Sequence, residues 1–565
     1  MKLVIKEYLA SLNERNELDA ILPDLLSQLG LTVFGKPIRG ASERGVDVAA
    51  VGSIYGGIEK VYLFSIKAGD LTRSTWNGNE DQALRPSLDE IIDSYIPNRL
   101  PPEHKGKPIV ICPCFGGDVQ TPVIDLFTGY MNSRSKDNIE FEVWHGDKLA
   151  GLINDDFLHE NFMPENTRSL LRKSLAILDE PDASFSYFSY LLSILRESVE
   201  EAKAEDVLKV LRQINICLWI LYGWSRQEKN LESVYLSSEI SYLNAWHIAS
   251  PFLDQKSKNA KLIQLSVQSI QKTYLKVSQD YLAKVVMPYM NEYGAISRGV
   301  SSSSSVDINL KLFDLLGRVA LMGLWCTWEL EVIQQNDEYK VLLAQHISYL
   351  AECIFSLIRN NPILFSPLKD EQAIDISLAV LFLAASSELD SIKDWFGELL
   401  SRIKISFKAH GAYPCTLQDY MELLEHPKAN TKEYLENCTA GSILFSSIGF
   451  FSALFNFDDE YKQVSEIQTE FLEHCSLQLW YPDDESEKGI YIGERYHGLC
   501  LSDFDFTQKK GVIIDRVFDE CKETKDFENL SAIKYGVFPL LLMSCRAYRL
   551  PVPMQFFENF RMKLT

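Results

Sequence analysis

The chain has 565 residues, a formal net charge of -22 and a pI near 5.0, with 46% hydrophobic and 24% charged residues. This composition is typical of a globular protein that divides into two to four domains, and it excludes a disordered or fibrous chain. The acidic charge excludes strong long-range attraction of the whole molecule to nucleic acid or to an anionic membrane, although a local basic surface or bound cations can still hold DNA.

The first residues, "MKLVIKEYLASLNERNELDA", are charged and lack both the apolar core and the cleavage site of a signal peptide. Two apolar windows, "ISLAVLFLAA" and "GSILFSSIGFFSALF", are shorter than the roughly 20 residues of a membrane span and are predicted to be buried helices. The eleven cysteines have no framework spacing. We therefore predict a cytoplasmic protein with reduced thiols and no membrane segment.

Residues 1–162 alternate helical and strand patterns. The helical run "ELDAILPDLLSQLG" precedes short β-branched or aromatic runs, "KVYLFSIKA", "KPIVICPCF" and "IEFEVWHG", with the helical segment "SLDEIIDSYI" between them. Cys112 and Cys114 would share one face of a strand, and without a second pair at zinc spacing we predict that they are buried structural residues. This alternation predicts an α/β domain with a mixed sheet flanked by helices.

From residue 163 onward the pattern is helical. Apolar residues recur every three or four positions, as in "YFSYLLSILRESVEEAKAEDVLKVLRQINICLWILYGW", almost without strand signals. The segment "GAISRGVSSSSSVD" is typical of an exposed loop and separates a helical region at 163–296 from another at 307–565. We predict a large all-α region in which no repeat of fixed period is visible.

Several common catalytic motifs do not occur in the sequence. It has no Gly-Lys-Ser/Thr phosphate loop, no G-x-G-x-x-G after a strand and no G-x-S-x-G nucleophile elbow. The sequence therefore gives no support to a nucleotide-driven, dinucleotide-dependent or serine-hydrolase reaction, and any chemistry is to be sought in the α/β domain.

The stretch "RGVDVAAVGSIYGGIEKVYLFSIKAGD" predicts a hairpin that carries catalytic residues. Asp47 precedes one strand, while Ser65 and Lys67 lie two positions apart on the next and therefore share a face. Hydrolysis of a phosphodiester needs a divalent cation with oxygen ligands and a positive charge near the attacking water. Asp47, Ser65 and the carbonyl of Ile66 could supply the ligands, and Asp19 on the preceding amphipathic helix could point back at the hairpin.

These residues resemble the PD-(D/E)XK nuclease superfamily, and specifically its Mrr-like restriction endonuclease domain. In that family an acidic helix with a Leu-Leu-x-x-x-Gly ending precedes a Gly-x-Asp strand and then a strand with Glu or Gln, any residue, and Lys. The matching positions are Asp19, Leu25, Leu26, Gly30, Asp47 and Lys67. The tail "IEFEVWHGDKLAGLI" also resembles the last strand and helix, so the resemblance covers about the first 160 residues.

The resemblance implies hydrolysis of DNA that depends on Mg²⁺ or Mn²⁺. By this resemblance Asp47 is a metal ligand, Lys67 positions or activates the water, and Asp19 is a supporting acid. Nuclease domains with long extensions are similar to bacterial defence effectors against phage or plasmid DNA. The helical region would then sense a trigger, form a homo-oligomer or bind a partner protein.

One position departs from the family, because Ser65 stands where the family has Glu or Gln. The site could bind the ion with fewer charges, it could recruit Asp70, Glu59 or Glu43, or it could be inactive. An inactive nuclease-like domain would be a module that binds DNA or a partner without cutting, joined to a helical assembly scaffold. In a third interpretation the helical region is itself the main actor, as a scaffold.

Other polar residues give weaker signals. Arg73, Gln82 and Arg85 follow the Lys67 strand and could contact a phosphate, while Trp76 is expected either to stack on a nucleotide or to lie in the core. In the helical region, His497 in "GERYHGLC" and the acidic run "YPDDESEK" invite a metal or acid-base interpretation; the alternative is a loop histidine and a solvated acidic loop.

Overall fold

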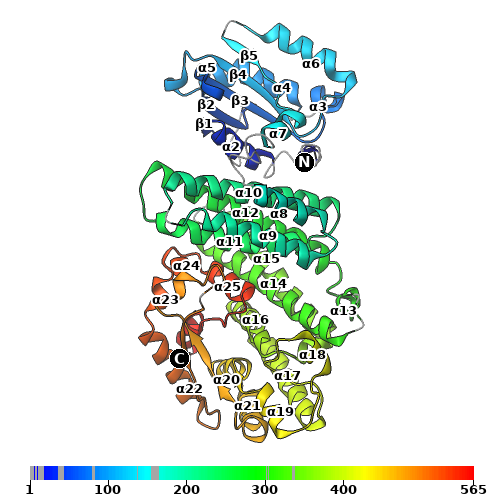
Figure 1. Ribbon diagram of the computed structural model, residues 1–565, viewed down its shortest axis with the longest axis vertical. Helices are drawn as coiled ribbons and strands as arrows, with labels where there is room; N and C mark the ends of the chain where they lie inside the picture. Colours follow the sequence, from blue (N-terminus) through cyan, green and yellow to red (C-terminus); the bar gives the residue numbers. More distant parts are fainter. Residues whose placement is uncertain are drawn as a thin grey trace. The chain divides into compact units, whose positions relative to one another are not determined.

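Figure 1 shows the computed structural model of the chain, which describes residues 6, 9–10, 18–35, 44–78, 83–136, 138–153, 165–200, 202–300, 302, 304–333, 337–494 and 496–564. Contacts divide the chain into two compact units, Met1–Thr273 and Tyr274–Thr565. A mixed sheet flanked by helices forms the first part of the first unit, and the rest of the chain is mainly helical. The predicted fold class is therefore confirmed.

The boundary between the two units falls within helix α12, Lys258–Val285. The serine-rich segment, at which the sequence predicts a break, leads into α14, Ser305–Val332, and the Ser304 hydroxyl accepts a hydrogen bond from the Val306 N–H at 3.2 Å. The domain limits placed at residues 162, 296 and 307 remain predictions.

The sheet has five strands in the order of the sequence. The first three form an antiparallel meander, and each of the last two is parallel to the strand before it. Their bounds are β1 Leu31–Gly35, β2 Val48–Gly52, β3 Lys60–Lys67, β4 Ile109–Phe115 and β5 Ile139–Phe141. The C-terminal ends of β3, β4 and β5 therefore lie at one edge of the sheet, together with the N-terminal end of β2.

The central strands β3 and β4 are buried on both faces because nearly all of their residues are apolar. Pro113 lies in β4, where its carbonyl accepts from the Trp144 N–H at 2.9 Å. Proline has no N–H that could donate a hydrogen bond to β5, so it weakens the ladder between β4 and β5. The ladder ends at the pair Ile111–Phe141, and only a single bridge between Cys114 and Trp144 continues it.

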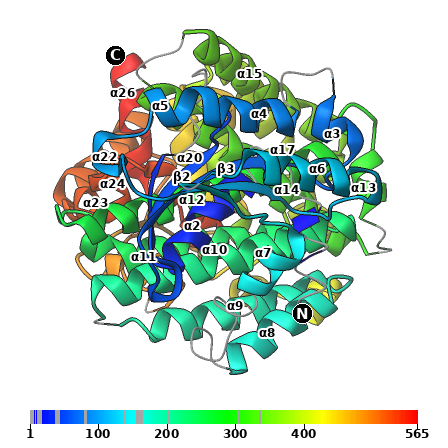
Figure 2. The same ribbon diagram turned by 90° about the horizontal axis from the view of Figure 1, so that it is seen from above.

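Helices cover both faces of the sheet. One face packs on α3, α4 and α6, where Trp76 meets Phe127 and Tyr130 edge to face. The helix α2 contacts β1 and β2. Figure 2 shows α4 and α5 as one continuous helix, joined by the π-helical turn Ile91–Tyr95. The bounds are α2 Asp19–Gln28, α3 Arg73–Asn77, α4 Leu84–Glu90, α5 Ile96–Asn98, α6 Thr121–Arg134 and α7 Gly146–Leu152.

Long helices complete the first unit. Helix α8 packs against α9, α9 packs against α11, and α10 packs against α11. Apolar side chains bury α10 on nearly all sides, as expected for a central helix. The bounds are α8 Glu165–Ala176, α9 Pro181–Glu197, α10 Ala204–Gln227 and α11 Glu232–Ala249, followed by α12.

The second unit is mainly helical and contains two small strand pairs, β6 with β7 and β8 with β9. The apolar windows predicted to be buried helices form α16 and α20, and both helices are buried. The helices are α13 Ala295–Gly299, α14, α15 Asp337–Asn360, α16 Ala373–Ala385, α17 Leu389–Ala409, α18 Tyr420–Glu425, α19 Lys432–Cys438, α20 Leu444–Leu454, α21 Asp458–Phe471, α22 Lys510–Glu523, α23 Asp526–Asn529, α24 Ser531–Lys534, α25 Phe538–Ala547 and α26 Glu558–Leu564. The strands are β6 Gly441–Ser442, β7 Ser476–Leu477, β8 Leu479–Tyr481 and β9 Leu499–Leu501.

Among the described residues, α15 is the one helix long and apolar enough to cross a membrane, judged by length and composition. In its most apolar stretch, 44% of the residues are buried within the protein. Core helices of soluble proteins meet the same criterion, so a single helix of this kind is a weak indication of a membrane.

The turns that follow β4 and β5 touch each other through their backbones. A Cβ atom added to Gly146 would lie 2.1 Å from the carbonyl oxygen of Gly116, and one added to Gly116 would lie 1.8 Å from the carbonyl oxygen of Leu9. The Gly146 N–H donates to the Gly117 carbonyl at 2.9 Å. Glycine is therefore required at these positions for close approach of the backbones.

We predict that Gly146→Ala destabilises the α/β domain by about 2 kcal/mol, because the added methyl group would overlap with backbone that cannot move independently. The matched control is Gly129→Ala in α6, where a Cβ atom meets nothing within 4 Å. That change should raise stability by about 0.5 to 1 kcal/mol through the helix propensity of alanine. Urea unfolding of the three proteins measures both effects, and equal stability of Gly146→Ala and wild type would contradict the close contact.

Candidate functional site

A Gly-Asp pair follows each of the three parallel strands, in a turn after β3 and after β4 and in the first turn of helix α7 after β5. Gly69 and Asp70 follow β3, Gly117 and Asp118 follow β4, and Gly146 and Asp147 come soon after β5. The carboxyl ends of parallel strands meet at one edge of a sheet, which is where ligands bind in open α/β sheets. This edge therefore gathers acidic side chains, and Asp47 joins them because β2 runs antiparallel to β3.

The hairpin holds Asp47 against β3, as the sequence predicts. The ladder pairs Val48 with Phe64, and the Asp47 N–H donates to the Phe64 carbonyl at 2.9 Å. The Asp47 carboxylate (Oδ2) accepts a hydrogen bond from the Ile66 N–H at 2.6 Å. The residue before Ser65 and the residue after it are thus both bound to Asp47. The carbonyl of Ile66 is a predicted metal ligand, whereas the group of Ile66 that contacts Asp47 is its N–H, which donates to the carboxylate.

Ser65 and Lys67 share the face of β3 that packs on α3, α4 and α6, together with Leu63 and Val61. Ser65 has no exposed surface, and its hydroxyl has no hydrogen-bond partner among the described residues. Lys67 is only 8% exposed. Burial of a hydroxyl without a partner costs about 1 to 3 kcal/mol, so Ser65 is an energetically unfavourable residue at this position.

Asp19 lies in the first turn of α2, and its side chain is half-buried. In the described part of the chain, neither Asp19 nor Asp47 belongs to a group of three acidic, histidine or cysteine side chains close enough to hold one ion. The role of Asp19 as a supporting acid remains a prediction.

The candidates to replace the family's second acid have other positions. The Asp70 carboxylate accepts from the Asp118 N–H at 2.8 Å and from the Gln120 amide at 3.5 Å, so it braces the turn after β4. Glu59 pairs with Lys107 at 3.1 Å and precedes β3, about 26 Å along the strand from Lys67 at 3.3 Å per residue. Glu43 and Gln82 lie outside the described residues.

The predicted phosphate contacts lie on α3 and α4. Arg73 opens α3 and is exposed, and Arg85 is exposed on α4, where its guanidinium lies 5.8 Å from the ring centroid of Tyr130. Trp76 is 1% exposed and belongs to the core, so it offers no surface for a nucleotide. Cys112 and Cys114 are buried, as predicted, and burial raises the pKa of both thiols above the ordinary range.

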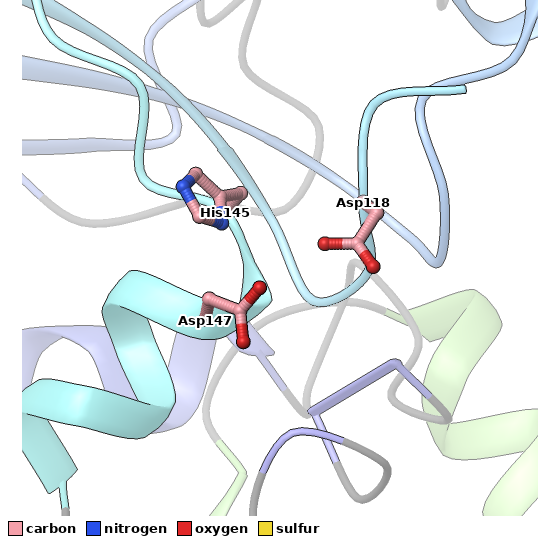
Figure 3. Close-up of side chains that lie close together, drawn as sticks. All are labelled: Asp118, His145 and Asp147. Carbon is pink, nitrogen blue, oxygen red and sulfur yellow. The ribbon is translucent and has the colours of Figure 1, made fainter. Parts of the chain in front are cut away.

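A second cluster lies at the same edge of the sheet and was not found from the sequence. Asp118, His145 and Asp147 place one ligand atom each within 4.8 Å of one another (Figure 3). The ammonium of Lys6 lies 2.8 Å from a carboxylate oxygen of Asp118 and of Asp147. The hydrogen bonds to Asp118 and Asp147 raise the pKa of Lys6. The repeated Gly-Asp pairs were the signal in the sequence that could have pointed to this cluster.

The three side chains of this cluster are of the types that bind a divalent cation, and the Lys6 ammonium already lies beside two of them. His145 Nδ1 is buried and has no hydrogen-bond partner within the described ranges. Two carboxylates with one imidazole suit Mn²⁺ better than Mg²⁺, because imidazole is a softer ligand than the oxygens that Mg²⁺ prefers. Lys6 neutralises part of the charge that such an ion would neutralise.

Comparisons with protein-family models, with curated proteins and with solved structures found no match. The arguments about function therefore depend on the geometry of the site and on its chemistry.

We predict that Lys6→Met makes the carboxylates of Asp118 and Asp147 more receptive to a divalent cation, because the competing ammonium is removed. Addition of Mn²⁺ should raise the melting temperature of this variant more than that of the wild type. The control is Lys107→Met, which removes a lysine from the ion pair with Glu59 elsewhere in the domain. Equal Mn²⁺ responses in all three proteins would show that the cluster is purely structural.

Proposed function

We propose that the N-terminal α/β domain is a metal-dependent endonuclease of the PD-(D/E)XK type that hydrolyses DNA phosphodiesters. The observation that carries this proposal is the hydrogen bond from the Ile66 N–H to the Asp47 carboxylate. It brings an acidic side chain to β3 between Ser65 and Lys67, in the order and strand context that the resemblance requires. The succession of α2, a meander of three strands, a helical segment and a parallel strand also supports it.

The donors at this hairpin fit a hard cation such as Mg²⁺ or Mn²⁺. Asp47 would supply a carboxylate oxygen, and the buried hydroxyl of Ser65, which has no partner among the described residues, would supply a neutral one. When bound, such an ion neutralises phosphate charge and lowers the pKa of a coordinated water. Lys67 would hold the attacking water or the phosphate, and its low exposure keeps its charge effective in a region of low dielectric constant.

The setting proposed for this activity is bacterial defence in the cytoplasm. All eleven cysteines lie in the described part of the chain and none of them forms a disulfide bond there, which suits a reducing compartment. The net charge of -22 opposes DNA binding. A homo-oligomer or a partner protein bound to the helical region would therefore supply part of the affinity for DNA.

A second candidate function is a nuclease-like module that binds DNA or a partner protein without cutting. The observation that favours it is the replacement of the family's second acid by Ser65, whose side chain is fully buried. A site with a single carboxylate on the hairpin holds a divalent cation less firmly than a site with two.

We predict cleavage of plasmid DNA in Mg²⁺ or Mn²⁺, and none in EDTA. Asp47→Asn and Lys67→Met should each lower the rate about a hundredfold or more, because each removes a group that acts on the phosphate or the water. The matched control is Lys60→Met, a lysine at the opposite end of the same strand. Folded wild-type protein that shifts DNA without cutting it, in either metal, would favour the binding module.

We also predict that Ser65→Glu couples folding to metal. The new carboxylate would be buried beside Asp47, so in EDTA the melting temperature should fall by several degrees. Mg²⁺ or Mn²⁺ should restore it, because the ion pairs with both carboxylates. The control Ser65→Gln has the same length without the charge and should show no comparable rescue. A Ser65→Glu variant that stays equally destabilised with and without metal would contradict a cation site at the hairpin.

A further inference from the structure

The second unit contains a cavity of about 330 Å³ that has no part in the proposed nuclease site. It lies where the acidic run "YPDDESEK" meets the segment around His497, two features of the sequence that the nuclease proposal leaves unexplained. Trp480, Tyr496 and His497 contribute three aromatic rings to its lining, and Ile490 and Pro551 contribute apolar surface. Its volume is at the lower limit of ligand pockets, which suits a ligand of one or two rings.

The backbone at Gly498 lies against the indole ring of Trp480. β8 carries Trp480 and pairs with β9, in which Cys500 lies opposite Trp480. A Cβ atom added to Gly498 would lie 1.9 Å from Trp480 Nε1 and 2.8 Å from the Tyr481 carbonyl oxygen. Only glycine permits this contact, and it fixes the position of the adjacent His497 relative to Trp480.

Asp483 orients the imidazole of His497. One carboxylate oxygen of Asp483 accepts from the Ser486 hydroxyl at 3.0 Å and from the N–H groups of Glu485 and Ser486, both at 3.1 Å. The other oxygen contacts His497 Nδ1. A carboxylate accepts hydrogen bonds only, so Nδ1 carries the proton and Nε2 is the remaining polar atom of the ring.

The Asp483 side of the Asp483–His497 pair is buried, and the His497 side is exposed to solvent. The side chain of Asp483 is 10% exposed, whereas that of His497 is 57% exposed. The Ser486 hydroxyl also lies 2.9 Å from the His497 carbonyl, so its one hydrogen is shared between this carbonyl and the Asp483 carboxylate, and it links the two segments. An imidazole that is held through Nδ1 and half open to solvent can offer Nε2 to a ligand with little loss of side-chain entropy.

We propose that this cavity binds a nucleobase, as a free nucleoside. Trp480 and Tyr496 provide flat aromatic surfaces on which a base stacks, and His497 Nε2 provides a hydrogen bond to the edge of the ring. The rings and the imidazole among the described lining residues recognise the base itself, so a free nucleoside is sufficient as the ligand.

Isothermal titration calorimetry of the full chain tests the proposal. Adenosine, guanosine, cytidine and thymidine are titrated to about 1 mM, the affinity range of weak ring-sized ligands. At least one nucleoside should bind. His497→Gln should weaken binding about tenfold through loss of the imidazole hydrogen bond. Tyr496→Ala should weaken it about tenfold through loss of stacking, and Tyr496 is 60% exposed, so this change spares the fold.

The matched controls lie in the same unit, away from the cavity. His346→Gln on α15 and Tyr293→Ala, at a tyrosine that is 69% exposed, should leave binding unchanged. No binding of any nucleoside would overturn the proposal, as would binding that both His497→Gln and Tyr496→Ala leave intact. Preference for a short oligonucleotide, a monosaccharide or free tryptophan over every nucleoside would also overturn it.

Discussion

The candidate nuclease site depends on the hydrogen bond between the Asp47 carboxylate and the Ile66 N–H. A charged acceptor makes this bond about twice as strong as a neutral one, and its length of 2.6 Å suits such a bond. It continues the contact between β2 and β3 beyond the last ladder pair, through a side chain instead of the backbone. Because Asp47 binds the backbone on either side of Ser65, the directions of the Ser65 and Lys67 side chains are set by the same contact.

The acidic side chains at this edge of the sheet are partly neutralised within the domain. Asp70 accepts the Asp118 N–H, and the Lys6 ammonium bridges Asp118 and Asp147, so the acids of the Gly-Asp pairs have partners near by. Lys67 is nearly buried in β3. The side chains of Asp118 and Asp147 are about half exposed, and Lys6 reduces the repulsion of DNA that they would otherwise cause. A divalent cation could bind among these charges only by replacing an internal partner of the carboxylates or by using oxygen atoms that have no partner.

Local patterns in the sequence were sufficient to predict the two-part fold and the hairpin. The two-residue period of a β-strand predicted that Ser65 and Lys67 share a face, and the structure places Asp47 against that strand. The cluster of Asp118, His145 and Asp147 was missed, because its members come from turns after different strands and meet only when the parallel order of β4 and β5 is known. Likewise, sequence spacing could not show that Asp483 reaches across 14 positions to His497.

Ser65 decides between the two interpretations of the hairpin. Burial of a hydroxyl without a partner costs stability, and alanine would fill nearly the same space without that cost. The position is surrounded by the apolar residues of the core, and all other residues of β3 between Val61 and Ile66 are hydrophobic. An oxygen atom at this point, beside a carboxylate held by β3 and two residues before a buried lysine, is explained if it faces a cation or a water that the reaction uses. Burial without a partner does not by itself mark a site, because other serine hydroxyls of the described chain share it, namely those of Ser225, Ser237, Ser278 and Ser452. The position of Ser65 beside Asp47 and Lys67 is therefore what supports the proposed active site.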